Sequence, residues 1–310
     1  MRMRGIVSEP YRCAVTESTP DVTIRPMRPE DVPAAERLSA EGFHELDSRM
    51  FRRSWPEPEL RPATRGAGWM IRTRHFLETD PGGCWVAEDE TGMLGIVTSF
   101  NREKLWCLAT YTVRPGLQGR GIGKPLLAAA LHHGRGSLRG MLASSSDPKA
   151  ARRYRLAGFS LHPQMFLAGA VDRSAIPVVE KVREGSAGDI DLMDSIDRQT
   201  RGAAHGPDHQ VMVGLWRLLV SDTTTGAGYA YVDGSSVALL AATNRRTASR
   251  LLWAALADIE GDALVGHVTA ANEWAVDVGL AARLALHQEG YLGLRGMSPP
   301  TPYLHNGSLL

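Results

Sequence analysis

The chain has little cysteine and no apolar run long enough to cross a membrane. Its three cysteines, Cys13, Cys84 and Cys107, are too few for a disulfide framework and lack the spacing of a metal site. Cys84 and Cys107 lie in apolar stretches, where we expect them to pack as small hydrophobic residues. The basic start Met1–Arg4 precedes no apolar segment of the kind that a secretory signal needs. We therefore expect a cytoplasmic protein that makes no membrane contact.

The chain also has almost no net charge, which removes the general attraction that draws a basic protein to nucleic acid. Its formal net charge is +1, and 43% hydrophobic and 22% charged residues make an ordinary globular composition. Residues 1–172 contain 24 basic and 19 acidic residues, whereas residues 173–310 contain 11 and 15. The first part is therefore the better host for an anionic ligand.

The length of 310 residues favours two domains. We expect a flexible leader over residues 1–21, a first domain over 22–172, a second over 173–297 and an irregular, proline-containing tail over 298–310. Both domains show the same order of strand, helices, strands, helix, strand, helix and strand, which indicates a duplicated architecture. The expected fold class is α/β of the α+β type, with two mixed, mostly antiparallel sheets flanked by helices.

The pattern of apolar residues places the individual elements. In the first domain we expect strands over residues 22–25, 84–88, 93–101, 105–113, 138–144 and 159–169. Helices are expected there over residues 28–42, 69–78, 121–133 and 148–157. In the second domain the expected strands are 178–183, 229–232, 237–242 and 264–269, and the expected helices are 187–199, 247–259 and 272–284. Short turns between the three strands from 84 to 113 indicate an antiparallel meander.

The most informative segment runs from Val113 to Lys124. A strand is expected to end at its start and a helix to begin at its end, with Gly119, Gly121 and Gly123 between them. Glycines let backbone amides approach a ligand closely and adopt positive φ angles. The first turn of the helix offers unpaired N–H groups and the positive end of its dipole, and two basic side chains add charge. The segment therefore predicts a cradle for a pyrophosphate group.

Two nucleotide-binding motifs have a similar appearance but fit this segment less well. The Rossmann glycine motif follows the first strand of a βαβ unit, whereas this segment follows the third strand of an antiparallel meander. A P-loop requires Ser or Thr after Gly-Lys, but Gly123 and Lys124 are followed by Pro125. A structural turn that binds no ligand is the remaining alternative.

The segment resembles the acyl-CoA loop of the GCN5-related N-acetyltransferase (GNAT) superfamily, whose pattern is Gln/Arg-x-x-Gly-x-Gly/Ala. Gln118, Gly121 and Gly123 occupy its three fixed positions. A second family pattern, Asn-x-x-Ala-x-x-x-Tyr-x-x-x-Gly-Phe, is matched at the same spacing by Asp147, Ala150, Tyr154, Gly158 and Phe159, with Asp147 replacing the Asn. The resemblance covers about residues 22–170. It implies that each sheet is splayed and that the chain is a tandem-GNAT protein.

The resemblance also implies roles for individual residues, with acetyl-CoA as co-substrate and no metal. The residues implied in cofactor binding are Thr112, Val113, Gln118, Gly119, Arg120, Gly121, Ile122, Gly123, Lys124, Ser145 and Asp147. Tyr154 would be the general acid that protonates the departing thiolate, since a phenol with a pKa near 10 is protonated at neutral pH. The alternative for Tyr154 is a core aromatic residue. An acceptor amine would attack the thioester directly, with a backbone N–H between Tyr111 and Val113 stabilising the oxyanion.

The general base is not identified by the sequence. The strand over 105–113 contains no carboxylate, where many relatives keep a Glu. Four residues lie where the family places acceptor-binding residues, although each also fits as a solvated surface side chain: Glu41, His44, Glu45 and Asp47. A covalent route through Cys107 is disfavoured, because this residue lies within the strand and several residues from the loop.

The second domain lacks the glycines that make the first a candidate cofactor site. Its strand over 237–242 is followed by Thr243–Thr247, where every residue has a side chain that would hinder the approach of a pyrophosphate. We expect a degenerate GNAT-like domain, and a second working site is the alternative.

The most unusual part of the second domain is residues 197–209, which gather histidines, arginines and aspartates in a turn rich in small residues. The first interpretation is a hydrogen-bonded loop with a helix that starts at Pro207. The second is a ligand or acceptor pocket. Zinc binding by His205 and His209 is the third, although the sequence offers no evident third ligand.

Taken together, these patterns predict an N-acetyltransferase that moves an acetyl group from acetyl-CoA to a primary amine of a small molecule. An acyl-CoA-binding protein without transferase activity and a protein N-acetyltransferase are the alternatives. The expected partners are acetyl-CoA and the amine, without nucleic acid or membrane. A homodimer is left open.

Overall fold

The computed structural model describes residues 22–53 and 55–310, so the leader expected over residues 1–21 and Cys13 lie outside the described part of the chain. The strands of the first half are β1 (Thr23–Pro26), β2 (Cys84–Asp89), β3 (Gly92–Arg102), β4 (Leu105–Val113), β5 (Arg139–Ser144) and β6 (Ser160–Ala170). Its helices are α1 (Val32–Met50), α2 (Ala63–Thr79), α3 (Gly123–His133) and α4 (Pro148–Leu156).

The second half repeats this order of elements. Its strands are β7 (Arg183–Glu184), β8 (Arg217–Thr223), β9 (Gly226–Asp233), β10 (Ser236–Ala242), β11 (Asp262–Thr269), β12 (Ala285–Arg295) and β13 (Tyr303–Leu304). Its helices are α5 (Ile190–Thr200), α6 (Asp208–Leu215), α7 (Arg245–Asp258) and α8 (Glu273–Ala281). Among the described residues, no helix has both the length and the apolar character that a membrane span requires.

The strands form one continuous sheet in the order β1-β2-β3-β4-β5-β12-β6-β11-β10-β9-β8-β7, and β13 pairs with β10 outside this path. The pairs β4–β5 and β10–β11 are parallel, and the other pairs are antiparallel. The expectation of mixed, mostly antiparallel sheets flanked by helices is therefore confirmed, although the two expected sheets are joined into one.

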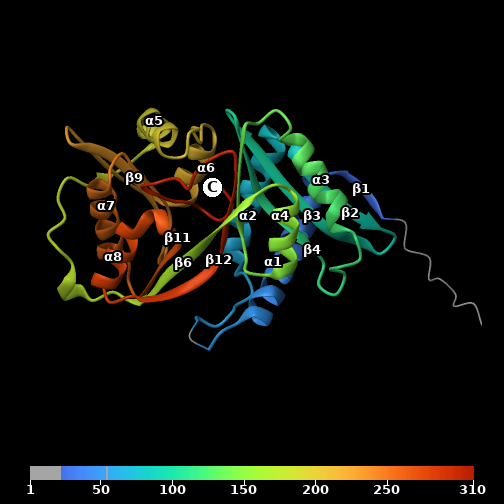
Figure 1. Ribbon diagram of the computed structural model, residues 1–310, viewed down its shortest axis with the longest axis horizontal. Coiled ribbons are helices and arrows are strands. Elements are labelled where there is room, and N and C mark those ends of the chain that lie inside the picture. Colours follow the sequence, from blue (N-terminus) through green and yellow to red (C-terminus); the bar gives the residue numbers. More distant parts are fainter. Residues whose placement is uncertain (1–21, 54) are drawn as a thin grey trace, which may run out of the picture.

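The last long strand of each half crosses into the other half. β6 pairs with β11 and β12, and β12 pairs with β5 and β6, so the centre of the sheet contains one strand from each half. Figure 1 shows β6 and β12 side by side in the middle of the molecule, between the blue-to-green and the orange-to-red parts. A boundary near residue 172 thus divides the chain but does not divide the sheet.

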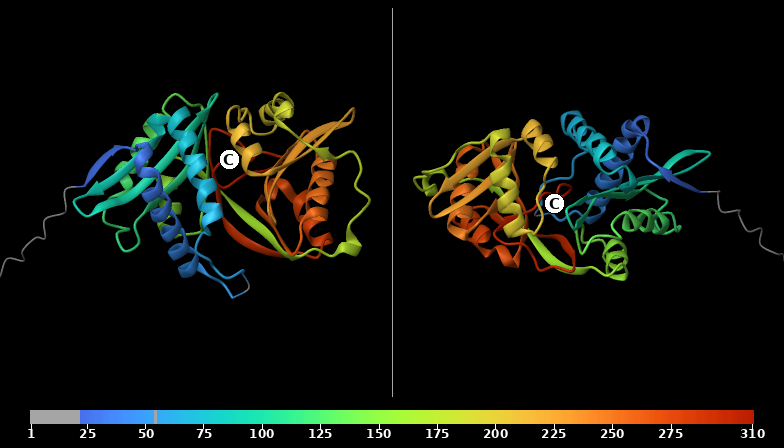
Figure 2. Two further views of the ribbon diagram at one scale, coloured as in Figure 1. Left: turned by 180° about the vertical axis from the view of Figure 1, so that it is seen from behind. Right: turned by 90° about the horizontal axis from the view of Figure 1, so that it is seen from above.

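Helices cover both faces of each half, as the views in Figure 2 show. In the first half, α3 and α4 pack on one face through a cluster that includes Leu126 and Phe159. Helices α1 and α2 pack on the other face. That side belongs to a core shared by the two halves, in which Phe76 of α2, Cys107 of β4 and Tyr229 of β9 are all fully buried. The halves therefore share a hydrophobic core rather than only a linker.

Two expected elements differ from the structure. The first helix does not end near Gly42 but continues to Met50. Gly42 lies where α1 crosses β4, and a Cβ there would collide with the Thr112 hydroxyl, so this glycine serves a close approach and not a helix end. The strand expected over 178–183 is reduced to β7, because residues before Arg183 pack against α7 without pairing with a strand. The structure adds β8, β12 and β13, to which the sequence analysis gave no residue range, and β13 lies in the tail expected to be irregular.

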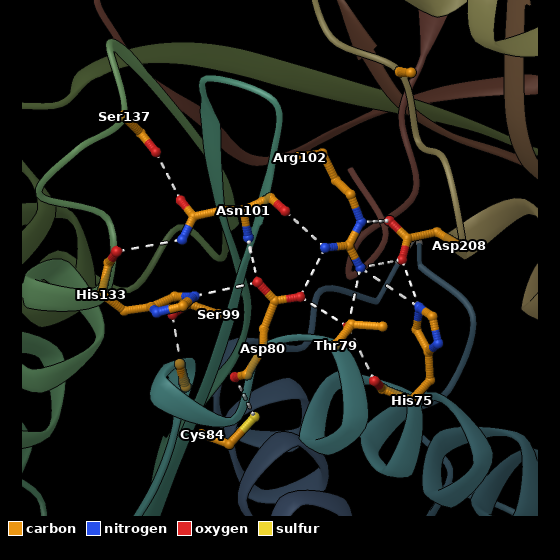
Figure 3. Close-up of polar contacts among 12 residues, drawn as sticks. His75, Thr79, Asp80, Cys84, Ser99, Asn101, Arg102, His133, Ser137 and Asp208 are labelled. Carbon is orange, nitrogen blue, oxygen red and sulfur yellow. Dashed lines mark hydrogen bonds and ion pairs between the residues drawn. The ribbon is translucent and has the colours of Figure 1, made fainter.

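A buried ionic network joins the two halves (Figure 3). The guanidinium group of Arg102 on β3 lies between Asp80, at the end of α2, and Asp208, the first residue of α6. Arg102 Nε donates to Asp208 Oδ2 at 2.8 Å, and Nη1 donates to Asp80 Oδ2 at 2.7 Å. His75 Nε2 lies 2.7 Å from Asp208 Oδ1. The three charged side chains are at most 7% exposed.

The carboxylates of this network are held in the ionised form. Burial alone would raise the pKa of Asp80, but hydrogen bonds from His133, Arg102 and the Asn101 N–H outweigh it and hold the pKa at about 2. Burial likewise opposes ionisation of Asp208, and hydrogen bonds from His75 and Arg102 lower its pKa in spite of it. Both aspartates therefore remain charged at neutral pH inside the protein.

Candidate functional site

The candidate site is a gap that opens between β4 and β5. The two strands pair in parallel only from Leu105 with Arg139 to Leu108 with Leu142. Directly after Leu108, the register of β4 against β3 shifts, which leaves Ala109 as an extra residue. Such a β-bulge bends a strand and increases its twist, so β4 turns away from β5 at this point. The splayed sheet implied by the family resemblance is thus present in the first half.

Two backbone N–H groups of β4 face this gap. The Arg114 N–H donates to Leu94 O at 2.8 Å. Hydrogen-bonded and non-hydrogen-bonded pairs alternate along an antiparallel ladder, so Thr112 is also bonded to β3, while Tyr111 and Val113 are directed away from it. Both N–H groups therefore lie on the side of β4 that faces β5, at a point where the two strands are no longer paired. A polar chain inserted into the gap would find these donors unpaired.

The glycine-rich segment after β4 surrounds the start of α3. Gly116, Gly119 and Gly121 have φ angles of +80°, +91° and +92°, and an added Cβ at any of them would meet no atom within 4 Å. These glycines are therefore required by backbone conformation, and the space around them is open. The first turn of α3 has no side-chain cap at its N-cap residue, Ile122. The Lys124 N–H donates to Gly121 O, and Pro125 has no N–H. The Ile122 and Gly123 N–H groups are therefore those available to an anion.

Gln118 has a structural task within this segment. Its Nε2 donates to Val113 O at 3.1 Å, and its Oε1 accepts from the Gly116 N–H at 3.2 Å. The side chain thus spans the turn and holds the end of β4 against the loop. Arg120 and Lys124 are exposed on the same segment. The residues that the sequence analysis assigned to the loop therefore lie together, with Gln118 shaping the turn.

Gly123 marks a close approach between α3 and β4. A Cβ at this position would collide with the hydroxyl group of Tyr111. The ring of Tyr111 packs edge-on against the ring of Tyr154 on α4, with 6.4 Å between the centroids. Tyr154 is 5% exposed, and burial, followed by the neighbouring Tyr111, raises its pKa above the ordinary value of a phenol. Tyr154 is therefore protonated at neutral pH and lies beside the strand that borders the gap.

Asp147 forms the junction between β5, α4 and α1. Its Oδ1 accepts from the Lys149 N–H at 2.7 Å and caps α4, while its Oδ2 accepts from Arg49 of α1 at 2.8 Å. The Asp147 N–H in turn lies 3.4 Å from the hydroxyl oxygen of Ser145. The aspartate that replaces the family's Asn thus fixes the end of α1 over the end of β5. The sequence offered no signal for Arg49 as its partner.

The second half supports the strand that borders the gap, because β12 pairs with β5 on the edge opposite β4, which the sequence analysis did not foresee. Gly290 lies at an irregularity in β12, between Gln288 and Tyr291. A Cβ at Gly290 would collide with the carbonyl group of Ser144, the last residue of β5. The backbone of β12 therefore runs directly against the end of β5, which only glycine permits at this distance.

The pKa values of the thiols and of one carboxylate near the gap bear on whether transfer is direct or passes through a covalent cysteine intermediate. Burial raises the pKa of both the Cys84 and the Cys107 thiol to about 12, so neither forms an appreciable amount of thiolate at neutral pH. Asp47 on α1 is an exposed residue. Partial desolvation of its carboxyl group by neighbouring atoms raises its pKa, the charge of His44 opposes this effect, and that of Glu289 on β12 adds to it. These environments favour direct attack by an acceptor over a covalent cysteine intermediate.

The histidine-rich segment of the second half forms a fully buried cluster around Asp197. Its carboxylate lies 2.6 Å from His205 Nδ1 and 3.0 Å from His209 Nε2, and it also accepts from the Tyr229 hydroxyl. Ligand atoms of Asp197, His205 and His209 lie within 4.8 Å of one another, so Asp197 is the third metal-type group that the sequence did not reveal. Hydrogen bonds within the cluster account for this arrangement, and the helix expected at Pro207 begins one residue later.

Comparison with known proteins supports the assignment of the fold. Residues 40–159 match the model of the acetyltransferase (GNAT) family. No curated protein matches the chain in sequence. A proposed acetyltransferase from Pyrococcus horikoshii is 16% identical with a TM-score of 0.72, over 96% of this chain and 99% of that one. A tandem GNAT protein from the clavulanic acid biosynthesis pathway is 13% identical with a TM-score of 0.56, over 89% and 98%.

A GCN5-related N-acetyltransferase from Kribbella flavida is also similar in structure, with 16% identity and a TM-score of 0.57 over 89% of this chain and 71% of that one. At such identities the likeness concerns the fold. Residues 40–159 thus match the GNAT family, and the chain as a whole has a fold similar to that of a tandem GNAT protein. Members of this family are acetyltransferases, and the fold is suited to acyl transfer from acyl-CoA.

Proposed function

We propose that the protein is an N-acetyltransferase whose first half, residues 22–172, binds acetyl-CoA and passes the acetyl group to a primary amine of a small molecule. The observation that carries this proposal is the open gap beside β4. Its Tyr111 and Val113 N–H groups face away from β3, and the uncapped first turn of α3 lies at its end. Amide donors along the gap suit the amide groups of pantetheine, and the helix start suits the pyrophosphate.

The direct mechanism follows from these positions. The amine nitrogen attacks the thioester carbon, and one of the two gap-facing N–H groups stabilises the negative charge that develops on the carbonyl oxygen. The C–S bond then breaks, and the thiolate receives a proton from the Tyr154 hydroxyl. Because burial keeps this phenol protonated, its proton is retained until the thiolate forms. The amine proton passes to a base that the sequence did not identify, and Asp47, whose pKa is raised, is our candidate.

A second candidate function is acyl-CoA binding without transfer. The observation that favours it is the absence of a carboxylate from β4, the strand that borders the gap. Binding and turnover must therefore be measured separately. The two candidates share the cofactor site and differ only in the acceptor chemistry.

The binding test is native mass spectrometry of the full chain titrated with acetyl-CoA, together with a Gly121→Asp variant. The added carboxylate would enter the open space beside the α3 start and repel a pyrophosphate, so we expect affinity to fall at least about tenfold. Gly261→Asp is the matched control, because it adds the same charge to an open position of the second half that also has a positive φ angle. Equal affinity of the two variants would contradict the site.

The turnover test follows release of the CoA thiol in the presence of small primary amines and, separately, of peptides with free amines. Turnover with small amines is the expected result. Turnover with peptides alone would replace the small-molecule acceptor by a protein. Tight binding of acetyl-CoA without turnover on either panel would favour the binding protein.

A further inference from the structure

The two halves contain the same backbone device at matching positions. In the first half, β4 and β5 separate after Leu108, where Ala109 forms a bulge. In the second half, β10 pairs in parallel with β11 only at Ser236 and Val237, and Ala238 is the extra residue that follows. Each bulge stands four residues before the last residue of its strand, Val113 or Ala242. The second half therefore has a gap equivalent to the candidate cofactor gap.

The N–H groups along the second gap have the same direction as those along the first. The Thr243 N–H donates to Ala227 O at 2.8 Å, just as the Arg114 N–H donates to Leu94 O. By the alternation of an antiparallel ladder, Leu240 and Ala242 are then directed away from β9 and into the gap. They are the counterparts of Tyr111 and Val113.

In the second half this gap is filled by residues of the chain itself. β13 lies antiparallel to β10, with Leu304 opposite Leu240 and Tyr303 opposite Ala241. The Ala242 N–H donates to Pro302 O at 3.2 Å. Tyr303 and Leu304 are each 1% exposed. The donors that face open space in the first half are thus occupied by a peptide segment in the second.

Side chains of the second half hold this segment in place. Asn272 Oδ1 accepts from the Tyr303 N–H at 3.0 Å, and Asn272 Nδ2 donates to Pro300 O at 3.1 Å. Asn306 Nδ2 donates to the carbonyl oxygen of the bulge residue Ala238 at 3.2 Å. The segment is therefore bonded at both of its ends and along the gap.

The counterpart of the phosphate cradle is closed as well. Asn244 is the N-cap of α7, and its Oδ1 accepts from the Thr247 N–H at 2.9 Å. Its Nδ2 donates to Thr225 O at 3.0 Å, which ties the cap to the neighbouring turn. The equivalent helix α3 has no such cap, and Pro125 stands at the position that corresponds to Thr247. In the second half the gap is therefore filled, and the helix start carries an internal cap.

We propose that residues 300–306 are an internal strand that replaces an acyl-CoA ligand in the second half, so that the chain takes up acyl-CoA in its first half only. The description of the first gap as an acyl-CoA site rests on the proposed function. The filling of the second gap stands on the contacts themselves. Part of the tail that was expected to be irregular therefore forms a strand, and this strand occupies the position of a ligand in the second gap.

Amide hydrogen exchange of the full chain, resolved to single residues by NMR, tests this inference. Without ligand, the Leu240 and Ala242 amides should exchange at least about 100-fold more slowly than those of Tyr111 and Val113, because only the former are hydrogen-bonded. Saturating CoA should slow exchange at Tyr111 and Val113 and leave Leu240 and Ala242 unchanged.

The outcomes separate this inference from the proposed function. Fast exchange at Leu240 and Ala242 in the free protein, or slowing of their exchange by CoA, would overturn the filled gap. Slow exchange there, with no effect of CoA on Tyr111 and Val113, would uphold the filled gap and refute the cofactor site of the first half.

A variant tests the anchoring of the segment. Asn272→Ala removes the hydrogen bonds to Tyr303 and Pro300, together with those to Thr269 and Trp274. Exchange at Ala242 should therefore accelerate about tenfold or more, while Tyr231 in the centre of β9 keeps its rate. Asn101→Ala is the matched control, since it removes two side-chain hydrogen bonds in the first half and should leave Ala242 unchanged. Unchanged exchange at Ala242 in Asn272→Ala, or equal acceleration at Ala242 and Tyr231, would contradict a separately held segment.

Discussion

Replacing Arg102 by methionine should be one of the more damaging single changes in this protein. The guanidinium group serves two buried carboxylates, and the side chain is 7% exposed. After Arg102→Met, Asp80 keeps its contacts with His133 and the Asn101 N–H, but the fully buried Asp208 keeps only His75. Removing one partner of a buried ion pair costs about 3–5 kcal/mol. We expect the free energy of unfolding to fall by this amount.

The assay is equilibrium unfolding in urea followed by tryptophan fluorescence, for which the chain has seven tryptophans. Because the halves share a core, we expect a single transition whose midpoint shifts to lower urea. Arg198→Met is the matched control. Arg198 also joins the halves, through Glu103, but its pair is exposed on both sides and should contribute less than about 1 kcal/mol.

A double variant checks the cause of the loss. Asp208→Asn in the Arg102→Met background removes the uncompensated charge, so part of the lost stability should return. The reasoning is refuted if Arg102→Met unfolds within about 1 kcal/mol of the Arg198→Met control, since a buried pair would then be no stronger than an exposed one. It is also refuted if the double variant is less stable than the single one.

Two further predictions concern catalysis and pH. Tyr154→Phe should reduce turnover by about 10²–10⁴-fold with little change in acetyl-CoA affinity, and a fully active variant would exclude this general acid. The pKa of Asp80 in the folded protein is about 2, below the ordinary value of about 3.9. Its stabilisation is therefore complete above pH 4 and is lost as the pH falls towards 2. The midpoint of urea unfolding, measured at several pH values between 4 and 2, should therefore fall less steeply with pH in Asp80→Asn than in the unaltered protein.

Local patterns predicted the elements and the loop well, because they depend on neighbours in the chain. The spacing of the glycines from 119 to 123 after a strand predicts the turn. The structure shows positive φ angles at Gly119 and Gly121. Gly42 was misinterpreted because a local pattern contains no information on contacts across the fold. A glycine that allows contact with Thr112, across the fold, is indistinguishable in sequence from one that ends a helix.

Features that depend on residues far apart in the chain could not be predicted from sequence patterns. Asp80, Arg102 and Asp208 form one network, but they come from different halves and each has an ordinary sequence context. The segment around Tyr303 appeared irregular because prolines surround it, and its two paired residues are too few for a periodic signal. The crossing of β6 and β12 between the halves could be predicted only from strand neighbours in the sheet. The alternation of residues along one strand does not specify those neighbours.

The crossing of β12 explains how a half with a filled gap still contributes to the candidate site. β5 ends at Ser144, and its free edge is covered by β12 through the pairs from Arg295 to Tyr291. Without the second half, the edge of β5 opposite β4 would be an exposed strand edge with unpaired backbone groups. Gly290 brings the β12 backbone against Ser144, two residues beyond the last β4–β5 pair at Leu142. The second half thus supports the strand that borders the first gap, while its own equivalent gap is closed by residues 300–306.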